Sequence, residues 1–367
     1  MQIAAASFFV TFLMSLLLSP LSHKLGLVDH PNERKLHTRR IPLVGGWAMY
    51  LATVASFLWF HNLSFSFHDI VLLFAASLLV LTGSIDDRFD LSYKLRIGIQ
   101  VFAACLIVYG AGIYVSDFGN LLGFGVIGLG ALAALFTIWA VMGLVNAYNM
   151  IDGIDGLAAG MGLVAITFVY VATSGQIPVL ESDLLLLIMG ALCAYLIFNL
   201  DLFPKQLPKI FMGDAGSMLL GFAIAVIMVR YSQGAERVLW PVTTLWFISI
   251  PVVDVFVTMS RRIKNGMSPF KPDRTHIHHV FQKAGYTNGR TLFVILSVQF
   301  ALASIGLMIQ RYVHLEWVSF VGICLVFALY FQIMVRSKLV VRLLAQEFHF
   351  FHSDAANDEV VVDQNQA

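Results

Sequence analysis

Hydrophobic positions along this chain gather into long runs instead of alternating with polar ones. About twenty apolar residues in helical conformation cross the ~30 Å hydrocarbon core of a bilayer. Continuous runs of this length indicate helices, because the strands of a membrane barrel show short segments of alternating hydrophobicity. The eleven predicted helices lie near 2–19, 43–60, 69–85, 97–114, 126–147, 157–174, 183–200, 214–230, 239–259, 291–310 and 316–335.

The basic residues fall almost entirely on one side of this predicted arrangement. With eleven spans, all but Arg230, Arg237 and Arg311 of the 23 Lys and Arg residues lie in segments that share one face. Basic residues accumulate on the cytoplasmic side of a membrane. No Lys or Arg precedes the first apolar run, unlike the start of a secretory signal peptide. We therefore predict an all-α, polytopic membrane helix bundle with its amino terminus outside and its carboxyl terminus in the cytoplasm.

Composition agrees with a membrane protein and excludes several other classes. Hydrophobic residues make up 59% of the 367 positions and charged residues 12%. The three cysteines all lie inside predicted spans, so no disulfide framework or zinc site is indicated. The basic residues follow membrane topology, so the net charge of +1 gives no indication of nucleic-acid binding. A single membrane domain is predicted over 1–336, followed by a partly disordered cytoplasmic tail over 337–367.

Carboxylates mark the predicted cytoplasmic ends of three different spans. Asp86 and Asp87 are adjacent at the end of one span, and Asp214 opens another. Neighbouring carboxylates repel each other unless a cation or proton intervenes. Hard divalent cations prefer carboxylate oxygens and often bridge to substrate phosphates. The pattern favours a magnesium site, with solvated helix ends as the alternative.

The stretch "NMIDGIDG" places two more carboxylates after an uncharged run. Asp152 and Asp155 share a face if this turn is helical. Gly153 and Gly156 leave room for close backbone approach or left-handed geometry, so such a turn can hold a polar ligand. The alternative interpretation is that Asp155 caps the helix that begins near Leu157.

Histidines cluster in "DRTHIHH", where His276 and His279 are three positions apart and His278 points elsewhere. Zinc usually needs a closed set of Cys or His ligands, and no loop contains a cysteine. Contact with a phosphate or pyrophosphate, helped by Arg274, is therefore favoured over zinc binding and over a solvated loop.

The ordered motifs resemble one known family. These are "DHPNERKLHTRRIPLVGG", "DDRFDLSYKLR", "NAYNMIDGIDGL", "FMGDAGS" and "MSPFKPDRTHIHH", and the resemblance to the polyprenyl-phosphate N-acetylhexosamine-1-phosphate transferases covers nearly all of residues 20–335. It implies transfer of N-acetylglucosamine-1-phosphate from UDP-N-acetylglucosamine to undecaprenyl phosphate, with release of UMP. The implied product is the lipid start of O-antigen or a related surface polysaccharide. The implied cofactor is Mg²⁺, with Mn²⁺ as the alternative.

The resemblance also implies roles for individual residues. Asp87 and Asp214 look like magnesium ligands, and Asp86 would orient or deprotonate the lipid phosphate. That phosphate is already largely ionised, since its second pKa is about 6, so positioning is the larger role of Asp86. The implied nucleotide-binding residues are Asn149, Asp152, Asp155, Asn199 and Phe211, and the implied sugar and pyrophosphate contacts are Lys94, Arg274, His276, His278 and His279.

Two other functions fit part of the pattern. The related phospho-MurNAc-pentapeptide transferases share the aspartate motifs, whereas the "PDRTHIHH" loop and the eleventh span favour N-acetylglucosamine by resemblance. An ion-coupled transporter would place Asp and His near the bilayer midplane, often in inverted repeats, but here they gather at one surface. The family further implies the bacterial inner membrane, a cytoplasmic active site and a possible homodimer. Direct displacement is preferred over a phospho-enzyme.

Overall fold

The computed structural model describes residues 2–30, 40–61, 66–235, 237–264, 266–268, 276–337 and 339–345. Within these ranges the chain is mostly helical and contains almost no sheet, which confirms the predicted all-α class. The only sheet among the described residues pairs β1 (Val28–Asp29) with β2 (Ile41–Pro42), antiparallel. The α-helices are α1 (Gln2–Leu25), α2 (Gly45–Phe60), α3 (Phe67–Phe89), α4 (Tyr93–Cys105), α5 (Ala133–Ile151), α6 (Leu157–Thr173), α7 (Val179–Asn199), α8 (Gly213–Ser232), α9 (Pro241–Phe247), α10 (Ser249–Lys264), α11 (Ile277–Lys283), α12 (Asn288–Met308) and α13 (Glu316–Val335).

The helices make the chain a multi-pass membrane protein. Eight of those in the described ranges are long and apolar enough to cross a bilayer. A ninth span results if α9 and α10, which meet at an angle of 83°, are counted together, and α2 and α6 are apolar but shorter. Each of the eleven predicted runs overlaps one of the eight long helices, the α9–α10 pair, α2 or α6. The count of eleven and the orientation stay predictions.

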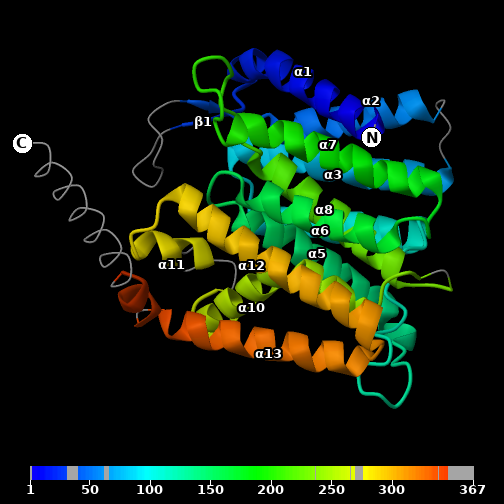
Figure 1. The fold of residues 1–367 in the computed structure, drawn as a ribbon. Coiled ribbons are helices and arrows are strands. Elements are labelled where there is room, and N and C mark those ends of the chain that lie inside the picture. Colours follow the sequence, from blue (N-terminus) through cyan, green and yellow to red (C-terminus); the bar gives the residue numbers. More distant parts are fainter. Residues whose placement is uncertain are drawn as a thin grey trace, which may run out of the picture.

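Helix α8 lies at the centre of the bundle and packs against α2, α3, α5 and α6. In Figure 1 the helices run across the picture, with α1 at the top, α13 at the bottom, and β1 and α11 together at the left end. Glycines allow the closest approaches to α8, as small residues do in membrane bundles. Gly83 of α3 meets the backbone at Asp214 and Ala215, and Gly46 of α2 meets that of Gly216. These contacts fix the first turn of α8 beside the last turns of α3.

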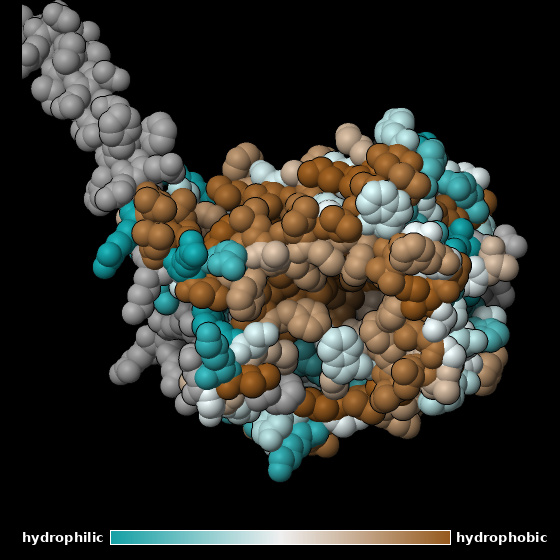
Figure 2. Space-filling view, turned by 90° about the horizontal axis from the view of Figure 1, so that it is seen from below, coloured by the Kyte–Doolittle hydropathy of each residue, from teal (hydrophilic) through white to brown (hydrophobic). Residues whose placement is uncertain are grey.

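The surface of the bundle is largely hydrophobic. Figure 2 shows one face on which hydrophobic side chains form a broad area around a central hollow, while most hydrophilic ones lie toward the ends. Large apolar side chains are exposed on most helices, for example Phe9 on α1, Phe74 on α3, Leu135 on α5 and Leu325 on α13. Such exposure is expected where lipid tails, and not water, surround the helices.

Replacing Gly83 by alanine should destabilise the protein. A Cβ at this position would collide with the backbone nitrogen and Cα of Ala215. Overpacking of this kind costs about 1–3 kcal/mol. We expect a lower midpoint of thermal unfolding in detergent for Gly83→Ala. Gly98→Ala on α4 is the matched control, because a Cβ there meets nothing within 4 Å. An equal response of the two variants would contradict close α3–α8 packing.

Candidate active site

A polar cleft of about 870 Å³ opens at the end of the bundle where β1 and α11 lie. Its walls come from the end of α3, the turn between α5 and α6, the end of α7, the segment before α8, and α11 with the start of α12. The sequence predicts that these segments share one face of the membrane, and in the structure they meet at one end of the bundle. Nine of the predicted site residues line the cleft: Asp86, Asp87, Asn149, Asp152, Asp155, Asn199, Phe211, Asp214 and His279.

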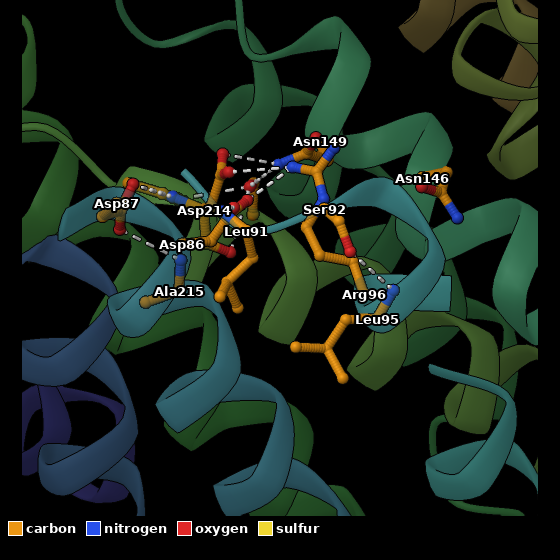
Figure 3. A network of polar contacts seen from close by, with 12 residues as sticks. Asp86, Asp87, Leu91, Ser92, Leu95, Arg96, Asn146, Asn149, Asp214 and Ala215 are labelled. Atoms are coloured by element: carbon orange, nitrogen blue, oxygen red, sulfur yellow. Dashed lines mark hydrogen bonds and ion pairs between the residues drawn. The ribbon is translucent and has the colours of Figure 1, made fainter. Parts of the chain in front are cut away.

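Arg96 joins two of the carboxylates that the sequence places far apart. Its Nη1 lies 2.5 Å from Oδ2 of Asp86 and 3.3 Å from Oδ2 of Asp214. Asp86 also accepts a hydrogen bond from the backbone nitrogen of Leu91 at 2.7 Å. Asn149 donates to Oδ1 of Asp214 at 2.8 Å, so α3, α4, α5 and α8 meet in one network (Figure 3). The guanidinium offsets the repulsion between the two carboxylates.

Asp87 caps the amino terminus of α8. Its Oδ1 accepts from the backbone nitrogen of Asp214 at 2.9 Å, and its Oδ2 from that of Ala215 at 3.4 Å. The first amides of a helix have no partner inside the helix, and its positive dipole end attracts a carboxylate. Gly213, with φ of +69°, lies against the Asp87 carboxylate, where a Cβ would collide with Oδ2. A residue with a side chain would therefore separate Asp87 from the amides that it caps.

The carboxylates fit a metal that arrives together with phosphate oxygens. Among the described residues, no group of three or more His, Cys, Asp and Glu side chains is placed to hold a metal ion. Mg²⁺ commonly uses one or two carboxylates, waters and substrate phosphates in place of an all-protein cage. Asp87 and Asp214 supply two such carboxylates from adjoining helices, both lining the cleft. The hard oxygen donors fit Mg²⁺, and Arg96 supplies positive charge beside them.

Residues 152–155, called here the acidic turn, are not helical. Helix α5 ends at Ile151, and the amino-terminal cap of α6 is Gly156, with φ of +78°. Asp155 is therefore not the cap of α6, and Asp152 and Asp155 do not share a helical face. Both still line the cleft, because the glycines turn the chain along its wall. Burial, followed by the negative charges of Asp155 and Asp87, raises the pKa of Asp152 from 3.8 to about 7.

Asn199 is buried and joins Gly156, which follows the acidic turn, to the segment before α8. Its Oδ1 accepts from the backbone nitrogen of Gly156 at 2.6 Å, and its Nδ2 donates to the carbonyl oxygen of Ile210 at 3.0 Å. These two bonds use both polar groups of the side chain. Asn199 therefore shapes the cleft wall.

Phe211 and Lys209 lie together on that wall. The Lys209 ammonium lies 2.6 Å from Oδ2 of Asp155 and 5.5 Å from the centre of the Phe211 ring. The sequence did not single out Lys209, and it gave Arg96 only as one of several basic residues that would add anion affinity. Both belong to the general excess of basic residues on this side, so charge alone does not distinguish them. One signal could have found Lys209. It lies two positions before Phe211, and residues two apart in an extended chain point to the same side.

The three histidines have different surroundings. His279 lines the cleft, and its Nδ1 lies 3.0 Å from Oε1 of Gln282. His278 is buried against Gly153, where a Cβ would collide with its Nε2. Burial, and then the neighbouring His279, lower the pKa of His278 from 6.5 to about 3, so its ring is neutral. His276 is buried beside Asp254 of α10, 2.6 Å away.

Four of the predicted contacts are not among the described residues that line the cleft: the buried His276 and His278, and Lys94 and Arg274. Lys94 is exposed on α4 and is not among the residues that line the cleft. Arg274 lies outside the described residues. Both assignments stay predictions.

Comparison with known proteins identifies relatives of this chain. Residues 70–232 match the model of glycosyl transferase family 4. The chain is similar to the undecaprenyl-phosphate alpha-N-acetylglucosaminyl 1-phosphate transferase of Haemophilus influenzae, with 38% identity over 331 residues, 88% of this chain and 92% of the relative. The proteins of the same name from Pasteurella multocida and Escherichia coli K12 are also 38% identical, over 92% of this chain and 94% and 91% of the relatives.

The raised pKa of Asp152 predicts a pH-dependent stability difference. Between its unfolded pKa of 3.8 and its folded pKa of about 7, the folded protein holds a proton that the unfolded chain releases. The stability contributed by this group therefore falls as pH rises through that window and is constant above it. Without added magnesium, Asp152→Asn should gain a few degrees in unfolding midpoint over the wild type at pH 8 and clearly less at pH 5. A difference that does not change with pH would contradict the assignment.

Proposed function

The chain belongs to glycosyl transferase family 4, together with the undecaprenyl-phosphate alpha-N-acetylglucosaminyl 1-phosphate transferases, and from this we propose its reaction. It transfers N-acetylglucosamine-1-phosphate from UDP-N-acetylglucosamine to undecaprenyl phosphate. An oxygen of the lipid phosphate attacks the phosphorus that carries the sugar, and UMP leaves. The product is undecaprenyl-pyrophosphoryl-N-acetylglucosamine, a lipid-linked precursor of surface polysaccharide.

The observation that carries the proposal is the meeting of Asp86, Asp87 and Asp214 at one end of an apolar bundle. Both substrates are anionic, so positive charge must offset their repulsion as they meet. We assign Asp87 and Asp214 to Mg²⁺, which would stabilise negative charge on the phosphates when bound. Asp86, held by Arg96 and the Leu91 amide, orients the acceptor side of the cleft. No carboxylate here needs to become a covalent nucleophile, because the lipid phosphate is itself ionised near neutral pH.

Another part of the cleft wall suits the nucleotide half of the donor. The acidic turn presents Asp152 and Asp155, and Phe211 offers an aromatic face at the same wall. The Phe211 ring stacks on uracil in this proposal, with the Lys209 ammonium beside it as a partner for phosphate. His279, on the α11 side, faces the sugar and pyrophosphate. UDP-MurNAc-pentapeptide is the alternative donor, and the names of the relatives favour N-acetylglucosamine.

An apolar groove of about 440 Å³ suits the lipid acceptor. It runs between α5, α8, α9 and α10, and Trp139, Gly143 and Asn146 of α5 lie along it. Asn146 is one helical turn before Asn149 of the carboxylate network, so the groove approaches the cleft along one helix face. The 83° bend between α9 and α10 forms part of the opposite wall. A polyprenyl chain in this groove would bring its phosphate toward Asp86 and Asp214.

The membrane placement follows from the charge distribution. The cleft lies at the end of the bundle to which the Lys- and Arg-rich segments connect, and this supports a cytoplasmic cleft, on the side where nucleotide sugars are present. We propose eleven spans, with α2, α6 and the α9–α10 pair among them, in the bacterial inner membrane. An odd number of spans puts the two termini on opposite sides, and the distribution of basic residues supports an amino terminus outside and a carboxyl terminus inside.

The first test is transfer of labelled N-acetylglucosamine-1-phosphate by the purified protein. Labelled lipid and UMP should form with magnesium and not with EDTA. Asp214→Asn should lose activity by more than about a hundredfold, as when a charge-stabilising group is removed. Asp201→Asn is the matched control, because Asp201 lies at the same end of the bundle without lining the cleft. If the lipid is labelled only from UDP-MurNAc-pentapeptide, that compound is the donor in place of UDP-N-acetylglucosamine. If neither donor labels the lipid, the proposed reaction is refuted.

The groove predicts a selective effect on the acceptor. A larger side chain at Gly143 enters open space on the groove wall, since a Cβ there meets nothing within 4 Å. Gly143→Leu should raise the KM for undecaprenyl phosphate about tenfold, equivalent to about 1.4 kcal/mol, and leave the KM for UDP-N-acetylglucosamine unchanged. Gly98→Leu on α4, equally unobstructed, should change neither. If Gly143→Leu and the wild type have the same KM for undecaprenyl phosphate, the acceptor does not bind in this groove.

A further inference from the structure

We propose that Asp254 and Tyr330, which lie outside the cleft, are positioning residues for this reaction. They hold His276 and thereby seat α11, with His279, over the donor side of the cleft. The inference rests on the proposed transferase function for its kinetic consequence. Its structural part, the seating of the histidines, stands on contacts among the described residues.

Asp254 of α10 is the centre of a buried polar network. Its Oδ2 lies 2.6 Å from Nδ1 of His276, and its Oδ1 accepts from the Tyr330 hydroxyl at 2.6 Å. The same Oδ1 accepts from the backbone nitrogen of Ile277, the first residue of α11, at 3.1 Å. The three side chains are all buried. One carboxylate thus ties together α10, the start of α11 and α13, the last long helix of the bundle.

The histidines carry this network to the acidic turn. The rings of His276 and His278 are parallel, with centres 5.9 Å apart, and His279 lies 4.1 Å from His278. His278 packs against Gly153, next to Asp152. A displaced His276 would therefore disturb both the ring that supports the acidic turn and the ring that lines the cleft. Helix α11 has only seven residues, so these contacts, more than its own length, fix its place.

Helix packing alone gives no reason for a carboxylate at position 254. Val253 and Val257 of α10 already pack against Tyr330 and Met334 of α13. Burying a charge costs free energy unless it is fully paired, and apolar substitutes of similar volume often hold helices together equally well. A carboxylate on one ring nitrogen does something that packing cannot do. It fixes the ring orientation and the tautomer, as outer carboxylates do for functional histidines.

The test compares Asp254→Asn and Tyr330→Phe with Ser319→Ala. Ser319 is a matched control because it is also buried on α13. Its Oγ accepts a hydrogen bond from Nε1 of Trp246 on α9 at 3.0 Å, and not from a histidine. Each variant removes one polar contact between α13 or α10 and its neighbours. Three quantities are measured: the kinetic constants for UDP-N-acetylglucosamine, inhibition by UMP, and the reaction of individual histidines with diethylpyrocarbonate, mapped by mass spectrometry.

We expect Asp254→Asn and Tyr330→Phe to lower kcat/KM for the donor by about tenfold to a hundredfold, the usual effect of removing such outer partners. Inhibition by UMP should weaken much less than kcat/KM, because the side chains proposed to bind the nucleotide are unchanged and the acidic turn is reached only indirectly, through His278. His276, protected by burial in the wild type, should become reactive. Ser319→Ala should behave as the wild type in all three. Wild-type kinetics in both variants, or an equal loss in Ser319→Ala, would overturn the proposal.

A double variant separates positioning from general support. If Asp254 acts through His276, adding Asp254→Asn to His276→Ala should cause no further loss of kcat/KM. A further loss of the same size as in the single variant would mean that Asp254 acts by another route and would overturn the proposal. Mapping the reactive histidines needs no turnover, so it distinguishes a failure of the proposed reaction from a failure of the proposed histidine network. A wild-type protein without transferase activity would refute the reaction, whereas unchanged protection of His276 in both variants would refute the network.

Discussion

The cap that Asp87 places on α8 connects the fold to the site. Helix α8 is the centre of the bundle, and its first amides lie at the floor of the cleft, where an unpaired buried amide would be costly. Asp87 reaches these amides only because Gly83 lets α3 approach the α8 backbone, and because Gly213 leaves space for the carboxylate. The apolar packing of two helices thus fixes the separation of the carboxylates. The same approach brings Asp214 within reach of Asn149 and Arg96.

This arrangement gives the carboxylates two tasks that compete. The oxygens of Asp87 that cap α8 are also the donors that we assign to magnesium, and Arg96 occupies the position of a counter-cation between Asp86 and Asp214. A bound cation must share or replace these partners. The preformed network therefore keeps the acidic cluster stable before substrates arrive, at some cost to the affinity for a free ion. Binding of the ion together with phosphates fits this balance better than a closed protein cage.

The sequence predicted the broad architecture and nine of the residues that line the cleft, because long apolar runs and acidic residues at their ends are local features. It could not predict partnerships across the bundle. Asp87 caps a helix that begins at Gly213, more than a hundred residues later. In the sequence, Asp254 is a single polar residue inside a predicted span, with no sign of its partners. Arg96 and Lys94 look alike in sequence, yet only Arg96 points into the carboxylate network (Figure 3). The spacing of Asp152 and Asp155 suggested a helical face, but the chain leaves α5 at Ile151.

Helix α10 has two faces that serve different parts of the site. Val252, Val255, Phe256 and Met259 line the apolar groove, whereas Asp254, between them in sequence, points toward α11 and α13. The 3.6-residue period of a helix separates these positions onto different sides. One wall of the apolar groove and the support of the histidines are therefore parts of the same helix. The position of α10 is fixed from one side by α5 and from the other by α13, so the last helix contributes to the geometry of the site without reaching the cleft.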